Sequence, residues 1–371
     1  MFNRAGSAPE RGDEQGQILV LAALLFTVVL GMTALAIDVG FFARADRDLQ
    51  NDADAMALAG ARELPVTSAA TTRAREWGAR NGVSSSEIQS ISYGVTCSGQ
   101  SVNDTITVRL RRPQVTFFGR ILGVTSGNVN ACATARRGQA ERGNGLLPIG
   151  MLHDNPNIAS NPEICYYTDP DVYGDECVIK VPKPSSGDTW VSGNTGPLRL
   201  DDPNPPQPNY PPGCRGQNNG NDEYGDNIVN GSQCYYKRGD KATPLTGAQA
   251  NTCGYFEDRL DGNTDKLADV FISDTDGDGV YDVVNRDSPR FGLIPVVKIA
   301  PGASGSSQDI TIVEYVAVYI VDISCSGGGV NEKATVTVIP MRAEVYYSET
   351  SFRTNPGAPG EALFWVIKLI E

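Results

Sequence analysis

Hydrophobic and polar positions near the start of the chain predict one long helix. Residues 18–37 (ILVLAALLFTVVLGMTALAI) carry no charged side chain. At about 1.5 Å of rise per residue they form a helix roughly 30 Å long, the thickness of a bilayer's hydrocarbon core. Beyond Asp38 small or apolar residues recur every three or four positions, as on one face of an amphipathic helix. They are Phe42, Ala45, Leu49, Ala53, Met56 and Gly60. We predict a single helix over 17–62, apolar first and amphipathic afterwards.

Two other interpretations of the apolar run compete with a retained membrane anchor. A buried core helix can be this apolar, although 20 uncharged residues so close to the start of a chain are unusual for one. A cleaved signal peptide is the stronger alternative, because Ala34-Leu35-Ala36 fits a small-residue cleavage site. Against cleavage, Asp13 and Glu14 precede the run where positive charge is expected.

The next part of the chain alternates between helical and strand patterns. A short helix is predicted around residues 71–80 (TTRAREWGAR), ending at Asn81-Gly82. Residues 88–97, 105–111 and 129–135 alternate as strands, and residues 117–122 suit a helical turn. We therefore predict a small α+β module over 63–140, following a short cytoplasmic tail over 1–16. A long helix, a short helix and a small sheet make a pilin-like plan.

Beyond residue 140 the pattern weakens and then becomes strongly β. Residues 141–289 are predicted to be a loop-rich, cysteine-containing region, with many Asn, Asp, Gly, Pro and Tyr residues over 154–250. From Arg290 onward, apolar and alternating segments predict a β-rich terminal domain over 290–371, sandwich-like, with alternation over Ile310, Ile312, Glu314 and Val316. The final segment FWVIKLI is too short to span a membrane and is interpreted as a buried strand. The predicted fold class is α+β.

The first helix also resembles a known family. The matching features are the Glu14-Gly16-Gln17 entry, the Ala-Ile-Asp38-Val-Gly40 exit, and Leu49-Gln50-Asn51 leading to Ala53-Asp54-Ala55 and Ala57-Leu58-Ala59-Gly60. Together they resemble the N-terminal segment of TadG-like proteins of the bacterial tight-adherence (Flp) pilus assembly machinery. The resemblance covers about 45 residues directly. It implies a membrane-anchored, pilin-like envelope protein whose partners are pilus and secretion machinery proteins.

Charge and cysteine content bear on compartment and partners. Lys+Arg 31 against Asp+Glu 44 gives a net charge of −13, which argues against nucleic acid as a partner. The eight cysteines all lie beyond the predicted anchor, and none forms a CxxC pair. We expect disulfides in an oxidising exterior, and so place the C-terminal part outside the cytoplasm of a bacterial cell with a single-pass anchor. Cys97 and Cys132 fall on two predicted strands and are paired.

One motif indicates a metal site. Residues 274–282 read DTDGDGVYD, the DxDxDGxxD pattern of calcium loops, as in dockerins and thrombospondin repeats. The predicted calcium ligands are Asp274, Asp276, Asp278, the backbone carbonyl of Val280, and Asp282 directly or through water. Asn285 stands where the bidentate Glu is expected, so binding is predicted to be weak. The alternative is an acidic turn without a metal.

Catalytic motifs are missing from the sequence. It contains no GxSxG, GxxxxGK or HExxH pattern, and His153 is the only histidine, interpreted as structural. We therefore expect neither an enzyme nor a small-molecule substrate. The expected function is a structural or assembly role in tight-adherence pili at the cell envelope. The alternative is a membrane-anchored calcium-binding surface adhesin.

The sequence predicts that the anchor is retained rather than cleaved. A prepilin-type cut after Gly12 or Gly16 would place Gln17 or Leu21 at the mature fifth position, where family pilins have Glu. N-terminal sequencing of the membrane-extracted protein is expected to show no cut within residues 12–37. A mature start at Asp13, Gln17 or Ile37 would contradict the prediction.

Overall fold

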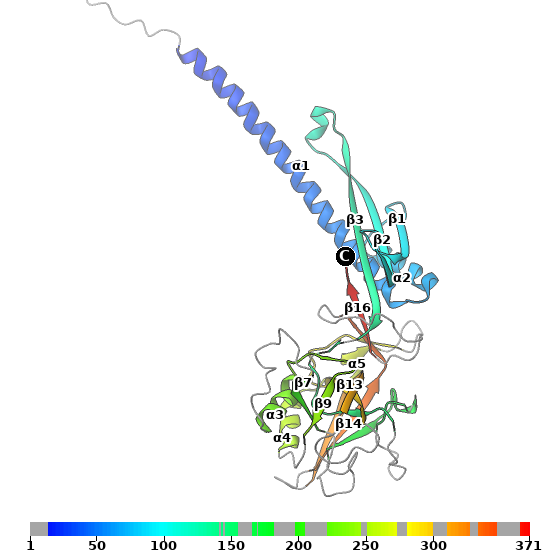
Figure 1. The fold of residues 1–371 in the computed structure, drawn as a ribbon. Helices are drawn as coiled ribbons and strands as arrows, with labels where there is room; N and C mark the ends of the chain where they lie inside the picture. The colour runs from blue at the N-terminus through cyan, green and yellow to red at the C-terminus, as the bar shows by residue number, and fades with distance from the viewer. Residues whose placement is uncertain are drawn as a thin grey trace, which may run out of the picture. The chain divides into compact units, whose positions relative to one another are not determined.

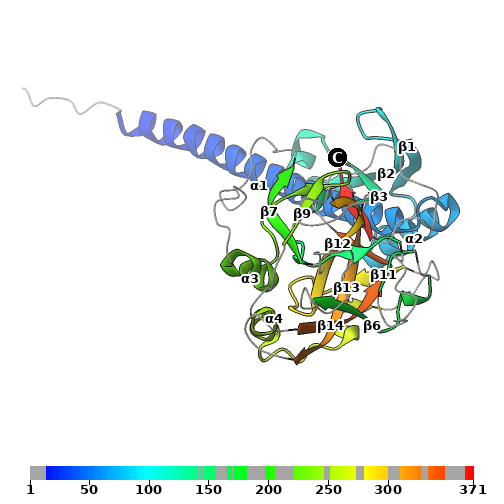
Figure 2. The ribbon, with the colours of Figure 1, turned by 60° about the horizontal axis from the view of Figure 1, so that its bottom comes forward.

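The computed structural model describes twelve segments of the chain, drawn as ribbon in Figures 1 and 2. They are residues 14–140, 142–143, 145–154, 165–168, 170–181, 197–204, 221–245, 251–272, 280–299, 310–326, 333–346 and 364–371. Contacts divide the chain into two compact units, residues 1–136 with 369–371, and residues 137–368.

The first unit contains the predicted helices and strands, most of them longer than the sequence pattern indicated. Its elements are α1 (Glu14–Arg62), α2 (Thr67–Arg80), β1 (Ile88–Val95), β2 (Ser101–Val115), the 3-10 helix η1 (Gly119–Leu122) and β3 (Ser126–Gln139). β3 belongs to this unit up to Arg136. The long helix is continuous through Asp38, as predicted.

The predicted amphipathic face of α1 packs in the core of this unit. Leu49, Ala53 and Met56 are completely buried, together with Ile106, Val108 and Leu110 of β2. Small residues dominate this part of the helix face, so α1 can approach its neighbours closely. A Cβ atom added at Gly60 would lie only 2.5 Å from Cδ1 of Ile106.

The strands of the first unit form a long antiparallel hairpin with one further strand on its edge. β2 pairs with β3 from Thr105↔Arg136 to Val115↔Ser126. β1 pairs with β2, with bulges near both of its ends. In Figure 1 the β2–β3 hairpin extends well beyond β1, because β2 continues past Ile88, the first residue of β1.

In its described residues, the second unit contains short strands, short helices and the longer strands β12, β13 and β14. Its elements are β4 (Arg142–Gly143), β5 (Met151–Leu152), η2 (Pro170–Val172), β6 (Cys177–Val181), β7 (Leu198–Asn204), α3 (Asn221–Asn230), β8 (Tyr236–Lys237), β9 (Lys241–Pro244), α4 (Thr252–Leu260), α5 (Leu267–Val270), β10 (Phe271–Ile272), β11 (Tyr281–Val283), β12 (Phe291–Ile299), β13 (Ile310–Ser326), β14 (Lys333–Met341), β15 (Ala343–Tyr346) and β16 (Phe364–Leu369). Residues from both the predicted loop-rich region and the predicted β-rich domain build this one unit.

Two apolar clusters form the core of the second unit, and both involve the sheet ordered β5-β12-β13-β14-β6. One cluster joins that sheet to β10, β15 and β16, through residues such as Phe271, Ala343 and Phe364. The other cluster joins it to α3 and α4, through Ile228 and Phe256. Because β16, β15, β11 and β10 are neighbours in a second sheet, the first cluster packs sheet on sheet and the second packs helices on a sheet. The C-terminal segment is the partly buried strand β16, as expected.

A β-bulge changes which residues of β13 share a face. Val296 and Val297 of β12 pair with Glu314 and Ile312, which leaves Val313 as the extra residue. Because a bulge inserts one residue, the period-two alternation reverses there. Ile310 and Ile312 belong to the first cluster, whereas Val316 belongs to the second. The single face predicted from alternation over Ile310–Val316 is therefore divided in two.

The helices α3, α4 and α5 lie in the region 141–289, which was predicted to be loop-rich. α3 and α4 are short, and Arg259 of α4 connects them to β12. Its guanidinium donates to the carbonyl oxygens of Ile228, Val229, Pro289 and Phe291 at 2.7–2.8 Å. Burial lowers the pKa of Arg259 to about 10, so the side chain is still charged at neutral pH. Carbonyl oxygens in the last turn of α3 are thereby satisfied by a side chain distant in sequence.

Disulfides reinforce both units. Cys97–Cys132 lies in the first unit, as predicted, although Cys97 follows β1 instead of lying in it. Cys165–Cys177 and Cys253–Cys325 lie in the second unit, where Cys234 is disulfide-bonded as well. Among the residues that the structure describes, no cysteine is a free thiol.

The two fully described disulfides of the second unit differ in the length of chain that they close. Their sequence separations are 72 residues for Cys253–Cys325 and 12 residues for Cys165–Cys177. The chain-entropy relation gives about 4 kcal/mol of stabilisation for the longer loop and about 3 kcal/mol for the shorter. We expect the Cys253→Ala/Cys325→Ala variant to unfold at lower urea concentration than the Cys165→Ala/Cys177→Ala variant. The reverse order would contradict this account.

Candidate functional site: the membrane anchor and its packing face

The first half of α1 is an exposed apolar surface. We call residues 18–37 the anchor run. Its large apolar side chains from Leu19 to Ile37 are 40–74% exposed, and none of its most apolar window is buried within the protein. Water disfavours so large a contiguous apolar surface, so an apolar environment must cover it. By length and composition the helix can cross a membrane once. The buried-core alternative is excluded by this exposure.

Asp38, the first charged residue after the anchor run, binds the far end of the β2–β3 hairpin. Its carboxylate accepts hydrogen bonds from the backbone N–H groups of Phe117 (2.7 Å), Phe118 (3.1 Å) and Gly119 (2.6 Å). These three donors lead into η1, so the carboxylate caps the start of that turn. The sequence showed Asp38 only as the end of an apolar run, because its partners lie about 80 residues away.

The hydrogen bonds also change the acidity of Asp38. Partial burial raises the pKa of its carboxyl, but the three N–H donors outweigh burial and hold that pKa below its ordinary value. The contribution of Asp38 to stability is therefore present above the pKa of the unfolded chain. It is lost as the pH falls through the lower folded pKa. At neutral pH the carboxylate is ionised and bound.

Farther along α1, a charged bridge connects the helix to β2. Arg112 of β2 binds Asp52 of α1 at 3.1 Å and also binds Glu87, which precedes β1. All three side chains are largely shielded from solvent. Burial by itself raises the pKa of Glu87, but its hydrogen bonds with Arg112 and Ser84 lower it overall. The bridge ties three elements together around one guanidinium.

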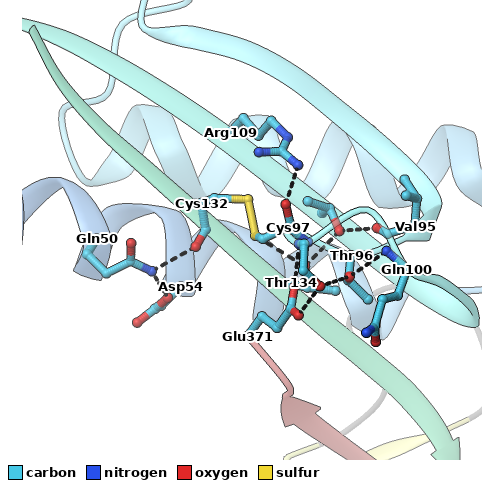
Figure 3. The surroundings of a disulfide bond; sticks show 12 residues. Gln50, Asp54, Val95, Thr96, Cys97, Gln100, Arg109, Cys132, Thr134 and Glu371 are labelled. Atoms are coloured by element: carbon cyan, nitrogen blue, oxygen red, sulfur yellow. Dashed lines mark hydrogen bonds between the residues drawn. A yellow bond between two sulfur atoms is a disulfide. The ribbon is translucent and has the colours of Figure 1, made fainter.

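A third connection joins α1 to β3 next to a disulfide (Figure 3). The side-chain amide of Gln50 donates to the carbonyl oxygen of Cys132 at 3.1 Å and to Asp54 at 2.7 Å. Cys132 is linked to Cys97, whose backbone N–H donates to the hydroxyl of Thr134 at 3.1 Å. The disulfide therefore fixes the strand segment that accepts the helix's hydrogen bond.

Three of the predicted calcium ligands, Asp274, Asp276 and Asp278, lie outside the described residues. The other two, Val280 and Asp282, lie just before and within β11 and are partly exposed. Asp282 pairs with Ile272 of β10 in an antiparallel ladder, so the two ends of the loop are held together. Within the part of the chain that the structure describes, no cluster of three or more metal-binding side chains occurs. Calcium binding remains a prediction.

His153 and the buried acid Glu314 are two further titratable groups of the second unit. The rings of His153 and Tyr167 stack with 5.0 Å between their centroids, and Nδ1 of His153 lies 2.7 Å from Oδ1 of Asp154. Both contacts are structural. Glu314, which the sequence marks only as part of a strand, is buried, and its carboxylate lies 3.5 Å from the guanidinium of Arg238. Burial raises the pKa of Glu314 to about 7, although Arg238 opposes the shift. Protonation thus favours the folded state, and that contribution is lost as pH rises through 7.

The fold and these contacts define a class of protein: a chain with one long helix that has an exposed apolar half and a half packed on a disulfide-linked sheet. Residues 16–63 match the model of the Tad family, described as Flp pilus-assembly TadE/G-like. The match covers both halves of α1, and the predicted resemblance of this segment is confirmed. Comparisons with curated proteins and with solved structures give no match.

Close packing around Gly60 gives a test of how α1 is held. An alanine Cβ there would lie 3.0 Å from the backbone oxygen of Ala70 and 3.1 Å from the Cβ of Ala74, whereas at Gly40 nothing lies within 4 Å. Both Gly→Ala changes gain about 1 kcal/mol of helix propensity. Overpacking should offset this gain only at Gly60, by about 1–3 kcal/mol.

We therefore expect Gly60→Ala to be less stable than Gly40→Ala in urea unfolding of the full chain in detergent, followed by circular dichroism. Equal stabilities for the two variants would show that α1 is not closely packed at Gly60.

Proposed function

We propose that this chain is a TadG-like component of the tight-adherence (Flp) pilus assembly machinery, with a structural or assembly role at the cell envelope. The anchor run holds it in the bacterial membrane as a single-pass protein, and the residues after Asp38 lie outside the cytoplasm. Pilus or secretion machinery proteins are its partners. One observation carries the proposal: the family match covers a continuous helix that is exposed and apolar in one half and packed on a folded unit in the other.

Two further observations support this proposal. Disulfides occur in both units, and such bonds persist in oxidising compartments such as the exterior and the periplasm. The chain has a net charge of −13, which suits a soluble domain without general affinity for anionic surfaces. A non-enzymatic role is consistent with the absence of familiar catalytic motifs from the sequence.

The experiment is a deletion strain of the native host, complemented by the full-length chain or by variants of the anchor run. Val28→Asp/Val29→Asp places two charges near the middle of the run, where each disfavours membrane insertion by about 3 kcal/mol. We expect this variant to leave the membrane fraction and to fail to restore sheared pili. The matched control, Val28→Leu/Val29→Leu, should restore both.

The same strains separate assembly from adhesion. Loss of pili in the deletion strain supports the assembly role. Normal pili with lost surface attachment would instead support the alternative function, a membrane-anchored calcium-binding surface adhesin. Normal pili and normal attachment would contradict both functions.

We also propose that residues 274–282 bind calcium weakly and act as a staple in the second unit. The motif supplies hard oxygen ligands at alternate positions, and the antiparallel pairing of β10 with β11 holds the ends of the loop together. Calorimetry of the full chain in detergent is expected to detect binding in the range of about 10⁻⁴–10⁻³ M. Asp276→Ala/Asp278→Ala should abolish the heat signal. Unchanged heat and melting temperature at millimolar calcium would identify an acidic turn.

A further inference from the structure

The connection between β2 and β3 presents an exposed apolar surface. We call Val115–Val124 the hairpin tip. Five of its apolar side chains are exposed: Val115 (52%), Phe117 (69%), Phe118 (37%), Ile121 (82%) and Val124 (54%). Isolated exposed apolar residues are normal, but a group of five on one short turn indicates a surface that something apolar covers.

Contacts within the first unit fix the hairpin tip beside one particular point of α1. The Asp38 carboxylate binds the N–H groups of Phe117, Phe118 and Gly119, as described above. The ring of Phe41 stacks on that of Phe117, with 6.0 Å between centroids. The tip is thus held by hydrogen bonds and by aromatic packing at the same turn of the helix.

That point of α1 is the end of the anchor run. Asp38 is the residue immediately after the uncharged residues 18–37, which have the length of a bilayer's hydrocarbon core. If those residues span the membrane, Asp38 lies at the boundary between hydrocarbon and headgroups. The hairpin tip bound to Asp38 must lie at the same boundary. Its N–H donors satisfy the Asp38 carboxylate there, where water is scarce.

The charge of the hairpin also suits a lipid surface. Between Pro113 and Ala135 the only charged residue is Arg120, which is exposed on the hairpin tip. A protein surface with Phe and aliphatic side chains beside a cation is typical of segments that lie in the interfacial region of a bilayer. The arginine side chain can extend its charge toward the headgroups while its neighbours contact acyl chains.

We propose that the hairpin tip inserts into the interfacial region of the bilayer that α1 spans, as a second membrane attachment. The inference rests on the membrane anchor of the proposed function. One helix alone leaves the first unit free to tilt and swivel relative to the membrane plane. A second attachment bonded to the helix at Asp38 restricts both motions.

The exposed apolar surface is continuous from the anchor run to the hairpin tip, and this favours a lipid surface over a protein partner as the cover of the tip. The exposed side chains of the anchor run continue through Val39 and Phe41, which are 58% and 45% exposed, to the hairpin tip. The same lipid that covers the anchor run is therefore the nearest apolar environment for the tip. A second copy of the chain is the other possible cover, and the experiment distinguishes it.

The experiment places a tryptophan on the hairpin tip of the full-length protein reconstituted in phosphatidylcholine vesicles. Ile121→Trp and Val124→Trp are tip probes at exposed positions. Gln100→Trp is the matched control, since it precedes the other end of β2, roughly 45 Å away at the rise of a strand. Emission is compared with that of the unsubstituted protein, with and without lipids brominated near the headgroup end of the acyl chains. Vesicle flotation of the unsubstituted protein tests the anchor separately.

We expect both tip probes to show blue-shifted emission that brominated lipid quenches, and the Gln100→Trp probe to be unaffected by bromine. Red-shifted, unquenched tip emission would place the tip in water and overturn the proposal. Blue-shifted emission without quenching would overturn it in favour of a protein cover. Equal quenching at Gln100→Trp would indicate general adsorption of the unit and also overturn it. Failure of the unsubstituted protein to float would refute the anchor, and the tip proposal with it.

Discussion

The first unit depends on one helix, α1, whose two halves suit two different environments. The anchor run of α1 exposes uncharged and mostly apolar side chains, whereas Leu49, Ala53 and Met56 on the later face are completely buried against the protein. Because the backbone hydrogen bonds of a helix are internal, the helix can pass between these environments without breaking. Only the side chains change. A helix of this kind can connect a membrane rigidly to the folded unit.

The polar contacts of α1 occur where that change takes place or soon after it. Asp38, Gln50 and Asp52 each bind a partner on or beside the β2–β3 hairpin. Each group is at least partly shielded, so an unpaired partner would carry a desolvation penalty. The contacts therefore select one rotation and one register of the helix on the sheet, which apolar packing of small residues alone specifies weakly. The disulfide Cys97–Cys132 holds the accepting strand in place.

The second unit is stabilised differently, because its middle region is poor in large apolar residues. Short segments such as α3, α4 and β6 bury a few apolar side chains each on the strands β12–β14. Covalent links and the buried Arg259, which satisfies four carbonyl oxygens, supply order that local sequence does not. Folding such a region costs much conformational entropy. Disulfides lower that cost because they already restrict the chain in the unfolded state.

By itself, the sequence determined the features that repeat with a local period. The uncharged run, the spacing of Leu49 to Gly60 and the alternation of the strands revealed α1, β1, β2 and β3, since neighbouring residues alone create those patterns. Only the tertiary structure decided which residues bind across the fold. The partners of Asp38 lie about 80 residues away, and α3 and α4 are held by packing, by the contacts of Arg259 and, in α4, by the disulfide Cys253–Cys325. The bulge at Val313 reversed the faces of β13, because one unpaired residue changes the parity of a strand and no local pattern marks it.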